Sequence, residues 1–242
     1  MIAFARFEIR RNLRDTRFLL FLVAMPTMLY LMLSGFSSSG SVGGLRAPVA
    51  FMVAMMCYAA IGSACYAIGP PLAQERATRW ARQLQIMPLR GTHWLMVKLI
   101  QGALLTIPGV AAVAVAAAVV HSPGLNAAEW SEVALVLLVG SLPFTVVGLV
   151  IGQSLEGQAA NSATLFIVLG LSFAGGLLIP DSQLPSAVRQ VAVALPSRQL
   201  ADLARGAAVG HPPSILGIAI LAAWALAASA GAVVLRRRDA AA

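Results

Sequence analysis

Charge is scarce in this sequence. Only 11% of its 242 residues are Asp, Glu, Lys or Arg, whereas 59% are hydrophobic. A soluble domain normally carries about a quarter charged residues, and one globular core could not bury so much apolar side chain while keeping a polar surface. The shortage excludes an ordinary soluble domain and predicts a polytopic membrane protein.

Acidic residues are scarcer than basic ones, with nine Asp and Glu against 17 Lys and Arg, and the net charge is +8. The basic residues gather at the ends of apolar runs, which is how membrane proteins fix their orientation. We therefore expect these basic residues to interact with a lipid bilayer and not with nucleic acid. No apolar run carries a central Asp or Glu, which argues against a proton relay or a sodium site.

Groups that could perform chemistry are also few. Cys57 and Cys65 lie in one apolar run, which favours small packing residues over a disulfide or a metal site. The three histidines show no zinc-ligand spacing, and the chain has no G-x-S-x-G elbow. We expect no metal and no catalytic residue, so the polar residues of the last loop are read as turn and cap residues: Asp181, Ser182, Ser197, Asp202 and His211.

Long apolar runs are what the chain has in abundance. A helix needs about 20 apolar residues to cross a bilayer, and six runs approach or exceed this length: 18–36, 48–69, 94–120, 133–151, 159–179 and 215–235. The sequence predicts one all-α membrane domain over residues 1–242 with six transmembrane helices.

Basic residues divide unevenly between the two sides that these spans define. Thirteen fall on the side of the N-terminus, and four fall on the other side: Arg46, Arg189, Arg198 and Arg205. Because Lys and Arg accumulate on the cytoplasmic side, both termini are expected in the cytoplasm.

Residues 1–17 have a helical period of their own. Arg6, Arg10, Arg14 and Arg17 share one face, and Ile2, Ile9 and Leu13 share the adjoining one. This pattern predicts an amphipathic helix that lies in the headgroup plane. The alternative is a plain basic anchor for the first span.

A charged island at 71–87 separates spans two and three. Its apolar stripe is Ala73, Ala77, Trp80 and Leu84, and its other side carries Glu75, Arg76, Arg79 and Arg82. Proline is accepted in a first helical turn and ends a helix elsewhere, so Pro71 and Pro88 bracket a short helix. We expect it on the cytoplasmic face with its charged side free to meet a partner; the alternative is a solvated loop.

Residues 181–212, on the outer side, contain two further helical patterns, 185–195 and 197–208, each too short to span. Irregular backbone at membrane depth survives only under a cover of protein or water, so we expect a pair of re-entrant half-helices. Their apolar stripes are Val188, Val191, Ala192 and Leu195, and then Leu200, Leu203, Ala204 and Ala207.

Special residues inside the spans give weaker signals. Pro26, Pro108 and Pro143 can each kink a helix, and Gly148 with Gly152 forms a G-x-x-x-G pair that favours close helix contact. Both features are also common in membrane helices without a special role. Lys98 is expected to snorkel to the inner interface, and Gln101, one turn deeper, could line a path.

Two segments resemble the permease subunits of ABC-2 type transporters, which are the transmembrane subunits of ABC exporters. The outer one carries Ile179-Pro180, Leu184-Pro185, Leu195-Pro196, Leu203-Ala204-Arg205-Gly206 and Gly210. The island carries Glu75-Arg76, Leu84, Met87-Pro88, Trp94 and Lys98, although Ala77-Thr78 replace the family's usual glycine. The resemblance covers the whole chain, and it assigns the re-entrant motif to Pro180, Pro185, Pro196, Arg205 and Gly206.

The resemblance implies that the island is a coupling helix held by a separate ATPase subunit. Its contact residues would be Glu75, Arg76, Arg79, Trp80, Arg82 and Leu84, with Glu156 of the loop after span four as a second contact. The chain has no G-x-x-x-x-G-K-[ST] motif, so ATP and Mg belong to that partner and this chain binds no cofactor.

The resemblance also implies the setting. A second permease copy is expected, a homodimer more than a heterodimer, in the cytoplasmic membrane of a bacterium. The implied activity is outward transport, and the uncharged spans favour an amphipathic or apolar cargo such as a drug or lipid. The alternative is a passive channel or scaffold protein without an ATPase.

Overall fold

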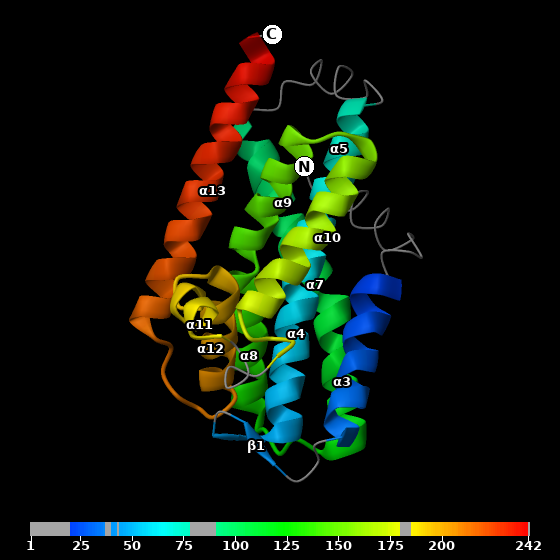
Figure 1. Ribbon diagram of the computed structural model, residues 1–242, viewed down its shortest axis with the longest axis vertical. Coiled ribbons are helices and arrows are strands. Elements are labelled where there is room, and N and C mark those ends of the chain that lie inside the picture. Colours follow the sequence, from blue (N-terminus) through cyan, green and yellow to red (C-terminus); the bar gives the residue numbers. More distant parts are fainter. Residues whose placement is uncertain (1–19, 37–39, 43, 78–90, 180–184, 242) are drawn as a thin grey trace.

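The computed structural model describes residues 20–36, 40–42, 44–77, 91–179 and 185–241, which form a helical bundle (Figure 1). Its elements in chain order are η1 (Leu20–Ala24), α3 (Met25–Phe36), β1 (Ser41–Val42), β2 (Leu45–Arg46), α4 (Ala47–Tyr66), α5 (Gly69–Ala77), α7 (Gly91–His121), α8 (Ala127–Gly140), α9 (Leu142–Ser154), α10 (Gly157–Ala174), α11 (Ser186–Ala192), α12 (Pro196–Ala207) and α13 (Ile215–Ala241).

Helix α4 lies at the centre of the bundle. Each of its residues except Pro48, Phe51 and Tyr66 is buried, and it packs against α3, α7, α9 and α12. Cys57 and Cys65 are both buried in this core, and the Cys65 thiol donates a 3.3 Å hydrogen bond to a main-chain carbonyl of α9. Their positions agree with the packing role expected from the sequence.

Five helical stretches are long and apolar enough to cross a membrane: Ala47–Ala77, Met96–His121, Ala127–Ser154, Gly157–Ala174 and Ile215–Leu235. They coincide with expected spans two to six and confirm an all-α polytopic membrane protein. In the described part of the chain, the first expected span contains a shorter apolar helix, Leu22–Gly35. Six crossings therefore stay a prediction.

The expected span 133–151 is not one regular helix. It divides into α8 and α9 at Ser141, two residues before Pro143. Proline has no N–H to donate to the carbonyl four residues back, and the Ser141 amide bonds two carbonyls of the last turn of α8 instead. Pro26 similarly follows the π-helical turn η1, whereas Pro108 lies inside the continuous helix α7.

The start of α8 is set by a cap rather than by hydropathy. The Glu129 amide donates to the Asn126 side chain at 2.9 Å, and the Asn126 amide donates to the Glu129 carboxylate at 2.8 Å. This capping box satisfies two amides that a helix start would otherwise leave free. The helix therefore begins at Ala127, six residues before the expected boundary.

The expected span 159–179 also ends early, at Ala174. Gly175 and Gly176 follow it, and Gly176 has a φ of +72°. A residue in this left-handed conformation ends a helix, and glycine adopts it without steric cost. Apolar composition alone could not reveal this boundary.

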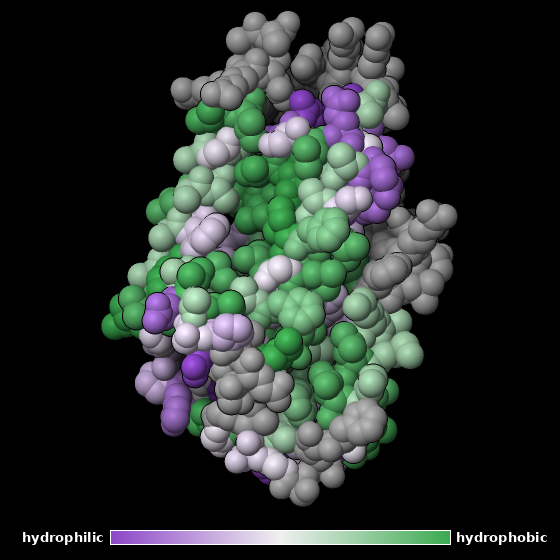
Figure 2. Space-filling model, in the orientation of Figure 1, coloured by the Kyte–Doolittle hydropathy of each residue, from purple (hydrophilic) through white to green (hydrophobic). Residues whose placement is uncertain are grey.

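The two ends of the bundle carry different features. The α5 end comprises α5, the turn between α9 and α10, and the C-terminal end of α13, and it is uppermost in Figure 1. The opposite hairpin end carries β1 and β2, which pair antiparallel with Ser41 opposite Arg46. Hydrophobic side chains cover much of the middle of the face in Figure 2, with hydrophilic ones gathered near α5 and beside α11 and α12.

Candidate functional site

The described part of the expected coupling helix is α5. It starts at Gly69 rather than at residue 71, and it follows α4 after a break at Ala67 and Ile68. Pro70 and Pro71 cause the break because neither can donate a backbone hydrogen bond to the preceding turn. Helix α5 packs against α9 and α10, so this segment continues the second span instead of standing apart from it.

Glu75 points into the bundle. Its carboxylate lies 4.0 Å from the Lys98 ammonium of α7, and the two side chains are only 12% and 2% exposed. The expectation that Lys98 snorkels to the interface is wrong, because its charge is met inside the protein. The partner lies 23 positions away in the sequence, so no helical period could indicate the pair.

Arg76 points the same way, toward the end of α9. Its guanidinium donates to the carbonyl of Gly152 at 3.4 Å and to the carbonyl of Gln153. The last carbonyls of a helix have no partner within it, and a cation there also complements the helix dipole. The expected free charged face therefore does not include Glu75 and Arg76, which tie α5 to α7 and α9.

Gly148 and Gly152 allow α9 to lie directly against α4 and α5. A Cβ atom at Gly148 would be 2.6 Å from the carbonyl oxygen of Cys65, and one at Gly152 would be 2.6 Å from that of Gly69. Real side chains do not approach main-chain oxygen so closely. The close contact expected of the G-x-x-x-G pair is confirmed.

The turn between α9 and α10 lies next to this contact. Helix α9 ends at Ser154, two residues follow, and α10 begins at Gly157. Glu156 occupies the N-cap position of α10 without capping it through its side chain, and it is exposed. Its carboxylate is thus available at the surface, unlike that of Glu75.

Two short helices, α11 and α12, occupy the segment expected to be re-entrant (Figure 1); α12 packs against α8 and α13, and α11 contacts α10. Their place in the membrane stays a prediction. Pro185 stands at the N-cap of α11, and Pro196 begins α12. The expected stripe of α12 is confirmed, since all four of its residues are buried: Leu200, Leu203, Ala204 and Ala207. In the stripe of α11, Ala192 is buried and Val191 is 63% exposed, so this stripe is only partly covered by the described residues.

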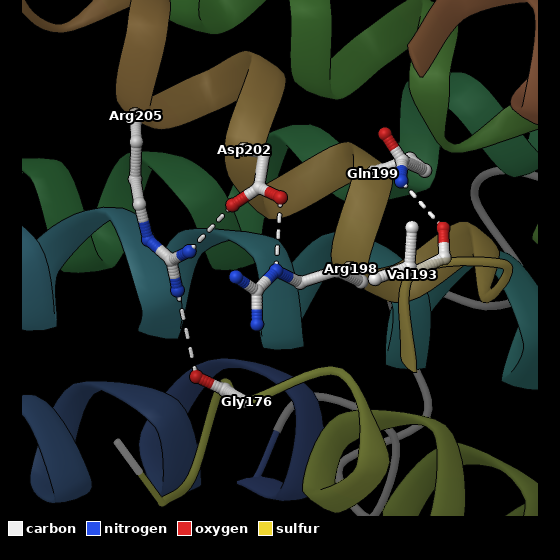
Figure 3. Close-up of polar contacts among 6 residues, drawn as sticks. All are labelled: Gly176, Val193, Arg198, Gln199, Asp202 and Arg205. Atoms are coloured by element: carbon white, nitrogen blue, oxygen red, sulfur yellow. Dashed lines mark hydrogen bonds and ion pairs between the residues drawn. The ribbon is translucent and has the colours of Figure 1, made fainter. Parts of the chain in front are cut away.

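Helix α12 is fastened to the end of α10. The Ser197 hydroxyl donates to the carbonyl of Leu171 at 2.6 Å. A Cβ atom at Gly175 would lie 2.5 Å from the same hydroxyl oxygen, so glycine is needed for this approach. Arg205 reaches the carbonyl of Gly176 at 3.5 Å (Figure 3). The early end of α10 thus creates the acceptors that α12 uses.

Asp202 lies between two arginines of the same helix (Figure 3). It accepts from Arg198 and from Arg205, both at 2.8 Å. The spacing of four and three residues is the spacing at which helical side chains meet, so the sequence contained a signal that our expectation of turn and cap residues missed. The carboxylate holds Arg205 in place for its contact with α10.

The end of α12 explains why Gly210 is a glycine. The His211 amide donates to the carbonyl of Gly206 at 2.9 Å, and the Gly210 amide donates to that of Ala207 at 3.2 Å. With Gly210 at a φ of +67°, this is the Schellman motif that closes helix C-termini. From α13, the Trp224 indole donates to the carbonyl of Ala194 at 2.9 Å, so both short helices are held by their neighbours.

Several predicted site residues lie outside the described residues. They are the four arginines of the interfacial helix, the second half of the island and the first proline of the re-entrant motif: Arg6, Arg10, Arg14, Arg17, Arg79, Trp80, Arg82, Leu84 and Pro180. Their roles stay predictions.

The Ser197 contact gives a first testable expectation. Replacing Ser197 with alanine removes the bond to α10 and leaves the Leu171 carbonyl without that donor, which should cost about 1 kcal/mol of unfolding free energy. The measurement is thermal unfolding of the purified protein. Ser131→Ala is the control, because that exposed hydroxyl bonds only a carbonyl of its own turn. Equal effects of the two changes would contradict a fastening role.

The structure thus defines a multi-pass helical membrane protein with a tightly packed α5 end and a pair of short helices, α11 and α12, before its last span. The model of the ABC-2 family transporter proteins matches residues 24–236, and the chain belongs to this family. It is also 25% identical over 219 residues to a Bacillus subtilis (strain 168) protein named "Putative transport permease YvfS", covering 90% of this chain and 89% of that protein. The predicted family is confirmed.

Proposed function

We propose that this chain is the transmembrane subunit of an ATP-binding cassette exporter driven by a separate ATPase subunit. Family membership supports a transport permease. The observation that carries the proposal further is the attachment of α5 to the last carbonyls of α9 by Arg76. This attachment joins α5 to the turn between α9 and α10, so a displacement of one by an ATPase is transmitted to the other.

The remaining features of the proposal follow the sequence and the family. Two copies of the chain form the path, both termini are cytoplasmic, and six helices cross the cytoplasmic membrane of a bacterium. The cargo is an amphipathic or apolar molecule that moves outward. Within the described spans, the buried charges are those of Lys98 and Glu75, and they neutralise each other. A transport path lined by these spans would therefore offer little to a strongly hydrophilic polymer.

Glu156 is suited to testing the contact with an ATPase, because it is exposed and takes no part in the contacts that Glu75 and Arg76 make inside the bundle. The chain is co-purified with the ATPase encoded beside its gene, and ATP hydrolysis is measured. Glu156→Arg should weaken association and lower the stimulated hydrolysis several-fold by reversing a contact charge. Gln158→Arg, two residues on and equally exposed, is the matched control.

The outcomes separate the proposal from its alternative. Loss of stimulation in Glu156→Arg with retention in Gln158→Arg supports an ATPase contact at this turn. If the wild-type chain binds no ATPase under any nucleotide condition, the exporter is rejected and a passive channel or scaffold takes its place.

A further inference from the structure

Gln101 of α7 belongs to neither the α5 contacts nor the helix pair α11 and α12. Its side chain is completely buried, and within the described residues neither its amide nitrogen nor its amide oxygen has a hydrogen-bond partner. A glutamine side chain offers two donors and an acceptor, and burying such a group without partners costs free energy. A group that both donates and accepts would satisfy this side chain.

Nearby polar residues on α7 avoid this cost. Thr106 is also completely buried, but its hydroxyl donates to the carbonyl of Ala103 at 2.7 Å. Leu105, one turn beyond Gln101, lies in an apolar cluster with Leu72 and Leu149. The unmet amide is thus a local feature and not the edge of a generally polar region.

Two isolated polar side chains, one of α7 and one that faces it, lie on either side of Gln101 along the helix, and the apolar Leu105 separates Gln101 from the second. One turn nearer the α5 end, Lys98 pairs with Glu75. Two turns farther in, a Cβ atom at Gly109 would lie 3.6 Å from the Ser63 hydroxyl of α4, and this buried hydroxyl has no partner among the described residues. Spacings of three and eight residues along α7 keep these positions on neighbouring faces.

We propose that Gln101 is the centre of a polar site near the α5 end of the bundle, which is closed in this conformation and becomes hydrated when the bundle opens. Its ligand is a small neutral group that both donates and accepts, which is a hydroxyl or amide of an amphipathic cargo, or water when cargo is absent. Bridging water satisfies buried amides in this way when it has two to four polar partners. The role in cargo binding rests on the proposed function; the hydration of the site does not.

Thiol accessibility tests the hydration. Gln101→Cys in the full-length chain is treated in inside-out membrane vesicles with a charged, membrane-impermeant methanethiosulfonate. Such reagents attack the thiolate, which forms in water and is suppressed in apolar surroundings. We expect labelling at least about tenfold faster than for Leu105→Cys, whose native side chain is 1% exposed among apolar groups. The wild-type chain, with Cys57 and Cys65 buried, gives the background rate.

A second measurement does not depend on the introduced cysteine. Gln101→Met keeps the side-chain length and removes an amide whose bonds are made only to water or cargo, so it should leave the melting temperature unchanged or raise it, whereas Thr106→Val removes a hydroxyl bonded within the protein and should lower it. A fall in melting temperature for Gln101→Met as large as that for Thr106→Val would mean that the amide makes its bonds within the protein, and it would overturn the site.

The cargo role is tested by measuring how the labelling rate of Gln101→Cys depends on the nucleotide bound to the partner ATPase. If the Gln101→Cys rate changes several-fold when the partner ATPase is trapped with ATP and vanadate, the site opens and closes with the transport cycle. If Gln101→Cys is as unreactive as Leu105→Cys, the hydrated site is overturned even when the ATPase co-purifies. If labelling is fast but insensitive to nucleotide, the cargo role is rejected, and the exporter itself is still decided by the Glu156 comparison.

Discussion

Replacing Gly148 with alanine should destabilise the protein, and replacing it with valine should largely abolish recovery of the folded chain. The new Cβ atom would lie 2.6 Å from the carbonyl oxygen and 3.0 Å from the Cα atom of Cys65. Both are main-chain atoms, so α9 must move away from α4. Overpacking costs about 1–3 kcal/mol, and the roughly 1 kcal/mol gained from alanine's helix propensity does not offset it.

Gly170 is the matched control for this experiment. It lies inside α10, is exposed, and has no atom within 4 Å of a Cβ built on it. Gly170→Ala should therefore leave the melting temperature unchanged or raise it slightly, because only the helix propensity changes. Thermal unfolding and gel filtration in detergent measure both variants. If Gly148→Ala melts at the same temperature as Gly170→Ala, the close contact of α9 with α4 does not limit stability.

The sequence was most informative where a local rule decides the structure. Apolar length predicted five of the spans, and Pro196 together with the apolar period of α12 predicted that helix and its buried face. Prolines have a fixed φ and no amide hydrogen, so their effect hardly depends on distant residues. The Gly148 and Gly152 pair belongs to the same class, since close approach needs only the absence of a side chain.

The sequence was least informative where the partner is distant. Glu75 has the pattern of a charge on the solvent side of an amphipathic helix, yet it meets Lys98 on another helix. Val191 shares an apolar stripe with Ala192, yet the bundle buries Ala192 and leaves Val191 63% exposed. A seven-residue helix has no complete face to bury, and the packing of its neighbours decides its orientation. These side-chain directions depend on tertiary contacts that a single sequence does not encode locally.

The largest effect at the α5 end is expected from Glu75→Ala. The change removes a carboxylate beside an ammonium that is 2% exposed, and breaking a buried ion pair from one side costs about 3–5 kcal/mol. We expect the lower end of that range because Glu75 is 12% exposed and the two atoms are 4.0 Å apart. The double variant Glu75→Gln/Lys98→Met should recover most of the loss, because it removes both charges and keeps the volume.

Comparison with the pair of Asp202 and Arg198 tests whether burial or distance determines the contribution of an ion pair to stability. Its atoms are closer, at 2.8 Å, but the carboxylate side chain is 43% exposed. Asp202 makes a second such pair with Arg205, and exposed helical pairs of this spacing contribute only about 0.3–0.5 kcal/mol each, so Asp202→Ala should still lower stability far less than Glu75→Ala. The opposite order would contradict the dominance of burial at the α5 end.

The variants Glu75→Ala and Glu75→Gln/Lys98→Met also show whether Glu75 contributes to coupling through its internal pair or through direct contact with the ATPase. The family resemblance makes Glu75 a direct contact of the ATPase, whereas the structure gives it an internal partner. If the double variant recovers both stability and ATPase stimulation, Glu75 acts by holding α5 against α7. If stability returns while stimulation stays low, the carboxylate meets the ATPase itself, and the internal pair must open when the two subunits engage.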